Sequence, residues 1–190
     1  MEQKRSTRLV LKTSDLTADS TTNIGSCDQY KTTFTWFNIN LRALLGDLYY
    51  QYDYFNMTLT NLSCSAMGSA VAAGSHDDRI LTVKISGLPF INQSYNQPTG
   101  NNGIFTTFAA YNLPTAHYGS NDQFYNNGAN VMTFRKDQDQ CNITIAFFRL
   151  TDDVPPALTS TFPNFIFIFA ITGIDKADNP DRINYLMKIN

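Results

Sequence analysis

The chain is 190 residues long, which is the size of one ordinary domain, and its formal net charge at pH 7 is −2. Aromatic residues make up 13% of it, and charged residues make up 16%, against roughly 25% in a typical soluble domain. In place of the missing charged residues the chain has neutral polar residues, chiefly Asn and Thr. Thr, Phe and Tyr favour strands, and Asn and Gly favour turns, so the composition excludes a coiled coil and a disordered tail. With so small a net charge, bulk electrostatics recruits neither nucleic acid nor an acidic membrane.

Eight β-strands are predicted from runs of β-branched and aromatic residues bounded by Gly, Pro, Asn and Asp. The predicted strands are residues 7–12, 31–37, 54–63, 79–86, 104–111, 130–136, 141–150 and 164–174. Leu9 and Leu11 alternate with other residues in the first strand, and Phe34 and Trp36 share one face of the second. The run Phe-Ile-Phe-Ile-Phe at 165–169 is apolar on both faces, so its outer side needs cover from a neighbouring element or another subunit.

A single helix of about three turns is predicted between the second and third strands, over residues 38–50. Asn38 or Asn40 can cap its first turn, because a side-chain oxygen there accepts a bond from a free backbone N–H. Its leucines recur at helical spacing and are expected to pack on the sandwich. These residues are Leu41, Leu44, Leu45 and Leu48.

The fold class predicted is all-β, an eight-stranded single jelly-roll β-sandwich with one short helix between early strands. Loops of about a dozen residues between strands favour the crossing connections of a jelly roll over the even hairpins of an up-and-down barrel. Neither a linker nor an internal repeat divides the chain, so residues 1–190 are expected to form one domain. Within it, residues 1–30 are expected to give the first strand and then an arm or loop.

The cysteines and the N-terminus indicate the compartment. Cys27, Cys64 and Cys141 are odd in number and widely spaced, which is not the pattern of a disulfide scaffold and fits a reducing compartment. The N-terminal residues lack the apolar stretch of a signal peptide, and the most apolar run, residues 165–171, is too short to cross a bilayer. We therefore expect a soluble chain that is not secreted and has no membrane span.

Residues that could carry catalysis form no convincing motif. His76 and His117 fall in two separate polar loops, and no H-x-H spacing places two metal ligands on one strand face. Cys64 has no sequence cue to a partner base. The adjacent acids at 77–78 and 152–153 diverge in direction, which is typical of solvated turns. We expect no catalytic residues, no bound metal and no cofactor.

Two further binding hypotheses stay open at this level. Aromatic residues in or beside Asn-rich loops could stack on sugars or contact other protein subunits, and sequence alone does not separate the two. These residues are Tyr95, Tyr111, Tyr118, Phe124 and Tyr125. The basic residues of the N-terminal segment could form an arm that faces nucleic acid, or could line a solvated strand edge. They are Lys4, Arg5, Arg8 and Lys12, set against a single Glu2.

One segment resembles a known family. Residues 35–63 read TWFNINLRALLGDLYYQYDYFNMTLTNLS, in which an aromatic-Asn-Ile-Asn stretch leads into a leucine-rich helix and then a Tyr-Asp-x-Phe-Asn strand. The opening RLVLKTSD at residues 8–15 is a short strand followed by a Ser-Asp turn. Both segments resemble the single jelly-roll penton and minor capsid proteins of large icosahedral double-stranded DNA viruses of the nucleocytoplasmic type.

The resemblance implies a structural virion protein, a capsid penton subunit that forms pentamers at the fivefold vertices. A minor capsid protein under or between the major capsomers is the alternative within this class, and a carbohydrate- or receptor-binding β-sandwich is the alternative outside it. The implied partners are copies of the same chain, the major capsid protein and other minor capsid proteins. The implied location is the virion, assembled in the host cytoplasm. In such a shell the basic N-terminal residues would form an inward-facing arm with no specific nucleic-acid target.

Overall fold

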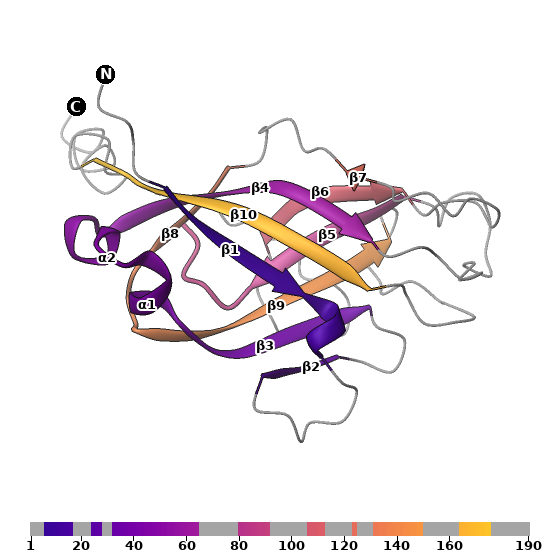
Figure 1. Ribbon diagram of the computed structural model, residues 1–190. Coiled ribbons are helices and arrows are strands. Elements are labelled where there is room, and N and C mark those ends of the chain that lie inside the picture. Colours follow the sequence, from indigo (N-terminus) through magenta and orange to yellow (C-terminus); the bar gives the residue numbers. More distant parts are fainter. Residues whose placement is uncertain are drawn as a thin grey trace, which may run out of the picture.

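The computed structural model describes residues 6–16, 24–27, 32–64, 80–91, 106–112, 123–124, 131–149 and 164–175. Their strands form two five-stranded sheets in which all pairs are antiparallel (Figure 1). The first sheet contains β1 (Ser6–Lys12), β10 (Phe165–Gly173), β4 (Tyr54–Cys64), β7 (Gln123–Phe124) and β8 (Val131–Arg135). The second contains β2 (Gly25–Cys27), β3 (Thr33–Asn40), β9 (Gln140–Arg149), β5 (Ile80–Ser86) and β6 (Thr106–Asn112).

The strand order is that of a jelly roll. Strands β2 and β7 have three and two residues, and the other eight strands run β1-β10-β4-β8 in one sheet and β3-β9-β5-β6 in the other. Among these eight, the first strand pairs with the last, the second with the seventh, the third with the sixth and the fourth with the fifth. This nested pairing is produced by two Greek keys folded over each other. The predicted fold class is confirmed, and each predicted strand overlaps one of these eight.

The predicted single helix is wrong in its length and its start. Strand β3 continues through Asn40, and the helical part is split into α1 (Leu41–Leu45) and α2 (Leu48–Gln51). Gly46 ends α1 with φ 56°, a backbone conformation that interrupts a right-handed helix. Asn40 does cap α1, since the Ala43 backbone N–H donates to its Oδ1 at 2.9 Å. Strands β2 and β7 lie in segments that were predicted to be loops.

The core lies between the two sheets and is rich in phenylalanine. Phe165 and Phe167 of β10 are fully buried and meet residues of β3 edge-on. Their ring centroids lie 6.2 Å from that of Phe34 and 6.3 Å from that of Trp36, respectively. Such tilted contacts are favourable beyond the area they bury. The predicted alternation of Leu9 and Leu11 and of Phe34 and Trp36 is confirmed, and along β10 the phenylalanines are buried while Ile166 and Ile168 lie on the outer face.

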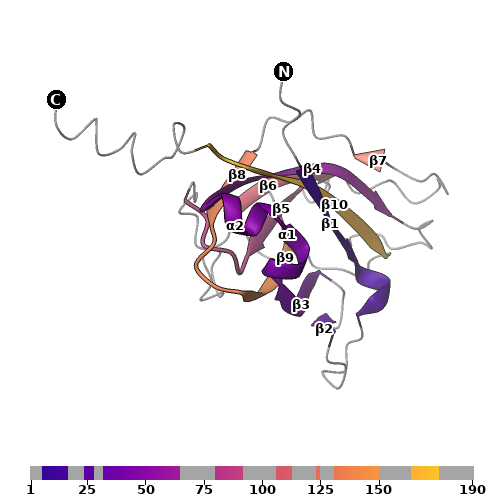
Figure 2. The same ribbon diagram turned by 60° about the vertical axis from the view of Figure 1, so that its left-hand side comes forward.

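Helices α1 and α2 lie together at one end of the sandwich (Figures 1 and 2). A third helical turn, η1 (Thr13–Asp15), follows β1 at the other end of that strand. The Phe165 backbone N–H donates to the Thr13 hydroxyl at 2.7 Å, which ties this turn to the start of β10. Both ends of β1 are therefore fixed by side-chain hydrogen bonds, since the Thr7 hydroxyl donates to the Leu44 carbonyl of α1 at 3.0 Å.

Candidate functional site

The residues weighed for catalysis and sugar binding are mostly outside the described part of the chain. His76, His117 and the acid pairs at 77–78 and 152–153 lie there, as do the side chains of Cys64 and of the five loop aromatics. Among the described residues, no three His, Cys, Asp or Glu side chains gather in a group that could hold a metal ion. Burial raises the pKa of the Cys141 thiol to about 11, so it is protonated at neutral pH. No helix within the described ranges is long and apolar enough to span a membrane.

The four leucines of the helical segment lie against the end of the core. Leu41, Leu45 and Leu48 are buried within it, and Leu44 is half-buried and packs against it. Helix α1 contacts β1, β3 and β9, and α2 contacts β10, so the helices touch both sheets. Their leucines extend the apolar interior past the ends of the strands.

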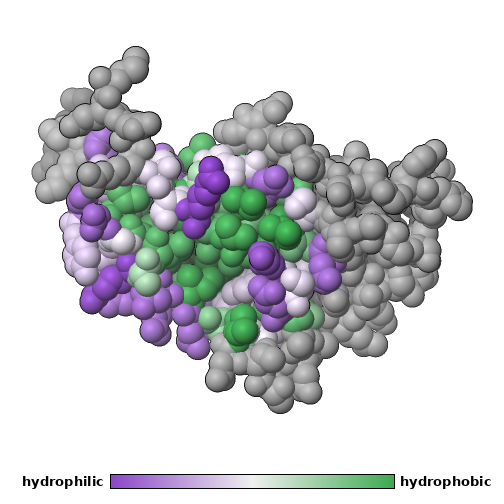
Figure 3. Space-filling view, in the orientation of Figure 1, coloured by the Kyte–Doolittle hydropathy of each residue, from purple (hydrophilic) through white to green (hydrophobic). Residues whose placement is uncertain are grey.

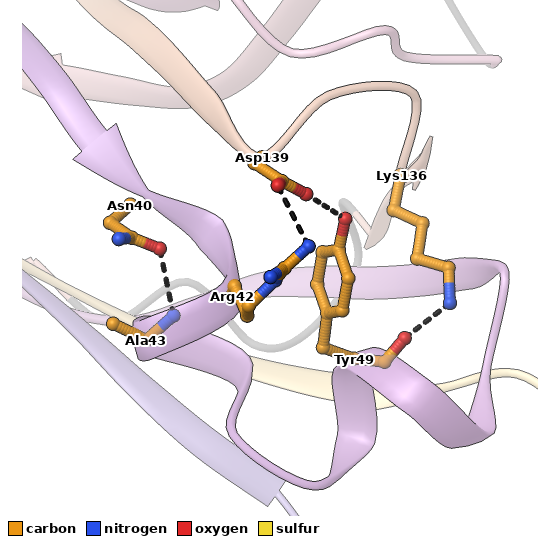
Figure 4. Close-up of polar contacts among 6 residues, drawn as sticks. All are labelled: Asn40, Arg42, Ala43, Tyr49, Lys136 and Asp139. Atoms are coloured by element: carbon orange, nitrogen blue, oxygen red, sulfur yellow. Dashed lines mark hydrogen bonds and ion pairs between the residues drawn. The ribbon is translucent and has the colours of Figure 1, made fainter.

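A polar cluster joins the helices to the connection between β8 and β9 (Figure 4). Asp139 accepts two hydrogen bonds, one from the Tyr49 hydroxyl and one from Arg42 Nη2 at 2.8 Å. The Arg42 and Lys136 cations lie 5.5 Å and 4.9 Å from the centroid of the Tyr49 ring, which stands between them in Figure 4. Lys136 Nζ also donates to the Tyr49 carbonyl oxygen and lies 3.4 Å from Asp53. The cluster fixes the helical connection onto the end of the sandwich.

We expect the Asp139→Ala substitution to lower the pKa of Tyr49. The hydrogen bond to Asp139 raises that pKa above its ordinary value of 10.0, and Arg42 alone would lower it. The measurement is a pH titration of the tyrosine ring carbons by NMR, with Tyr49→Phe to assign the signal. Asp53→Ala, which removes a carboxylate that is not bonded to Tyr49, serves as the control. A Tyr49 pKa that stays the same in Asp139→Ala would contradict the contact.

The outer face of the β1–β10 pair carries exposed aliphatic side chains. Val10 and Ile166 are 47% and 37% exposed, and Ile168 is half-buried. Val10 pairs with Ile168 in the ladder, so the three side chains are neighbours across the two strands. We call Val10, Ile166 and Ile168 the outer ridge. Figure 3 shows hydrophobic residues gathered over this part of the sheet.

The outer face of the second sheet differs from this one, because it is buried where β5 pairs with β9. Ala146 and Phe148 form a small cluster separate from the main core, and Lys84 beside them is 1% exposed. The Lys84 ammonium lies 5.3 Å from the centroid of the Phe148 ring. Among the described residues, the exposed ridge is therefore a property of the β1–β10 face.

Two of the four predicted basic residues flank this ridge. Arg8 and Lys12 are exposed on the outer face of β1, on either side of Val10, and Lys4 and Arg5 lie outside the described residues. Neither Arg8 nor Lys12 makes an ion pair with any residue that the structure describes. The surface thus combines an aliphatic centre with two cations available to a partner.

No protein-family model and no curated protein matches the chain. Among solved structures, the mavirus penton protein is similar with a TM-score of 0.27 and 9% identity, over 79% of this chain and 57% of that one. The chain thus spans a little over half the length of that protein. The Mud crab tombus-like virus structure is similar with a TM-score of 0.19 and 9% identity, over 98% of this chain and 89% of that one. Both similarities are weak, and the jelly-roll assignment rests on the strand order alone.

Proposed function

We propose that this chain is a structural subunit of the capsid of a large icosahedral DNA virus, and that five copies form the penton at a fivefold vertex. The observation that carries the proposal is the exposed outer ridge on one sheet of a jelly roll. Jelly rolls build viral capsids, lectins and cupins. An exposed aliphatic ridge on the outer face of a sheet favours the first of these, because a neighbouring subunit would cover it. The resemblance of residues 35–63 to capsid proteins supports the same class.

A fivefold ring requires a head-to-tail interface, in which the ridge of one subunit meets a different surface of the next. Aliphatic side chains at the centre with charges beside them follow the usual anatomy of such an interface. In this role the protein resides in the virion beside the major and minor capsid proteins. The role requires neither catalysis nor a cofactor.

Light scattering of the purified protein over a range of concentration and salt tests this proposal. A mass near five times 21.4 kDa is expected. Val10→Asp and Ile166→Asp should reduce the mass to that of the monomer. Ile24→Asp is the matched control, because Ile24 is 56% exposed beside β2 of the other sheet.

A monomeric wild-type protein under all of these conditions would overturn the penton assignment and favour the minor capsid role. Saturable binding of that monomer on a glycan array would favour the carbohydrate-binding alternative. Loss of the pentamer in Ile24→Asp alone would show that a different surface makes the ring.

A further inference from the structure

Strand β1 has one edge along which no described strand continues the sheet. It pairs with β10 in continuous register, from Ser6 opposite Thr172 to Lys12 opposite Ile166, with no bulge and no Pro or Gly. On the opposite edge, the Thr7 hydroxyl bonds to α1 near one end of the strand. Beyond that bond, nothing in the described ranges pairs with residues 8–12 along this edge. An open, regular edge is a template for another strand.

Two other sheet edges are covered by backbone. Strand β2 pairs along the outer edge of β3. Residues 89–91 cover the outer edge of β8, where the Ile91 N–H donates to the Thr133 carbonyl at 2.8 Å and the Arg135 N–H donates to the Pro89 carbonyl at 3.2 Å. The described residues therefore cover the outer edges of β3 and β8 and leave the outer edge of β1 unpaired.

A second copy of β1 is a poor partner for this edge. If two copies paired antiparallel about Val10, Arg8 of each copy would face Lys12 of the other. Registers shifted by two residues bring these cations directly opposite or diagonal to one another. Like charges in those positions destabilise a strand pair. Registers shifted by one residue would place the core faces of the two copies on opposite sides of the joined sheet, so that Val10 of one copy would face the buried Leu9 or Leu11 position of the other.

We infer that the open edge of β1 accepts an extended segment of a different polypeptide, with two carboxylates four residues apart and an aliphatic residue midway between them. The carboxylates would pair with Arg8 and Lys12, the aliphatic residue would lie beside Val10, and the backbone would continue the ladder. Two cations alone give weak binding to nucleic acid or to anionic lipid, and neither of those has a polypeptide backbone that could continue the hydrogen-bond ladder of β1.

The chain itself does not supply this segment. Its only acidic residues four apart are Asp15 and Asp19, with Thr17 midway between them. Asp15 belongs to η1, and the next residue, Leu16, is buried in the core at 4% exposure. Arg8, Val10 and Lys12 also lie at the proposed ring interface, but the inference does not require a ring, because strand addition uses the unpaired backbone edge of β1.

Fluorescence anisotropy with two synthetic peptides tests the inference. The glutamate peptide is Thr-Glu-Val-Ile-Val-Glu-Thr, and the lysine peptide replaces both glutamates by lysine. We expect the wild-type protein to bind the glutamate peptide at least tenfold more tightly, because two cross-strand charge pairs change from attractive to repulsive in the lysine peptide. The double variant Arg8→Glu, Lys12→Glu should reverse the preference. Both positions are exposed, and equal thermal melting of variant and wild type verifies the fold.

Three outcomes would overturn the inference. The first is that the wild-type protein binds the two peptides equally, or that the double variant still prefers the glutamate peptide. The second is undiminished binding of a glutamate peptide that is N-methylated at alternate residues along one edge, because strand addition requires those backbone N–H groups. The third is displacement of the glutamate peptide by a DNA duplex or by vesicles containing phosphatidylserine, which would identify the site as a polyanion site.

Discussion

Replacing Phe167 by aspartate is expected to lower the free energy of unfolding by more than about 4 kcal/mol, or to prevent folding. The Phe167 side chain is fully buried among aromatic rings, with the centroids of Phe165, Trp36 and Phe147 at 6.0, 6.3 and 6.4 Å. The substitution removes these contacts and leaves a cavity. It also places an ionisable group in an apolar interior, where the carboxyl group loses its hydration.

The matched control is the same substitution at the neighbouring position of the same strand. Ile166 is 37% exposed on the outer face, so Ile166→Asp should change the free energy of unfolding by no more than about 1 kcal/mol. Urea denaturation of both variants as monomers measures the difference. A similar loss for the two would contradict the assignment of inner and outer faces along β10.

Much of the sandwich could be predicted because a strand carries its burial pattern locally. The alternation of Leu9 and Leu11, and of Phe34 and Trp36, shows which face of each strand is buried without reference to any other strand. The two-sided apolar run of β10 likewise predicted that an outer face needs cover. Leucine spacing predicted helical structure correctly, but it did not show that Gly46 divides the segment into two helices.

The candidate surfaces could not be predicted to the same degree, because they depend on which strands become neighbours. Arg42 and Asp139 are 97 residues apart in the sequence, and neither has a local pattern that points to the other. Val10 joins Ile168 in the outer ridge only through the register of β1 with β10. The open edge of β1 is likewise a property of the sheet order. Strand β2 has three residues and is defined by its pairing with β3, so it gave no periodic signal of its own.

Gly87→Ala is the second substitution with a large expected effect, a loss of about 3 kcal/mol or more in the free energy of unfolding. Gly87 follows β5 with φ 101°, a conformation that is strained for any residue with a side chain. A Cβ atom there would lie 1.7 Å from the Asn142 carbonyl oxygen of β9. That oxygen belongs to the backbone, so relief requires β5 and β9 to move apart where Ser86 pairs with Thr144.

The control separates the two causes of that loss. Gly46 also has a positive φ, of 56°, but a Cβ atom there would meet nothing within 4 Å, so Gly46→Ala should cost only the backbone strain, about 1–2 kcal/mol. Urea denaturation of both variants measures the contrast. Similar losses in the two variants would mean that backbone conformation alone accounts for the effect of Gly87→Ala. The backbones of β5 and β9 would then not approach so closely at this point. A much larger loss for Gly87→Ala would support the pairing of the fourth and seventh jelly-roll strands, on which the second sheet depends.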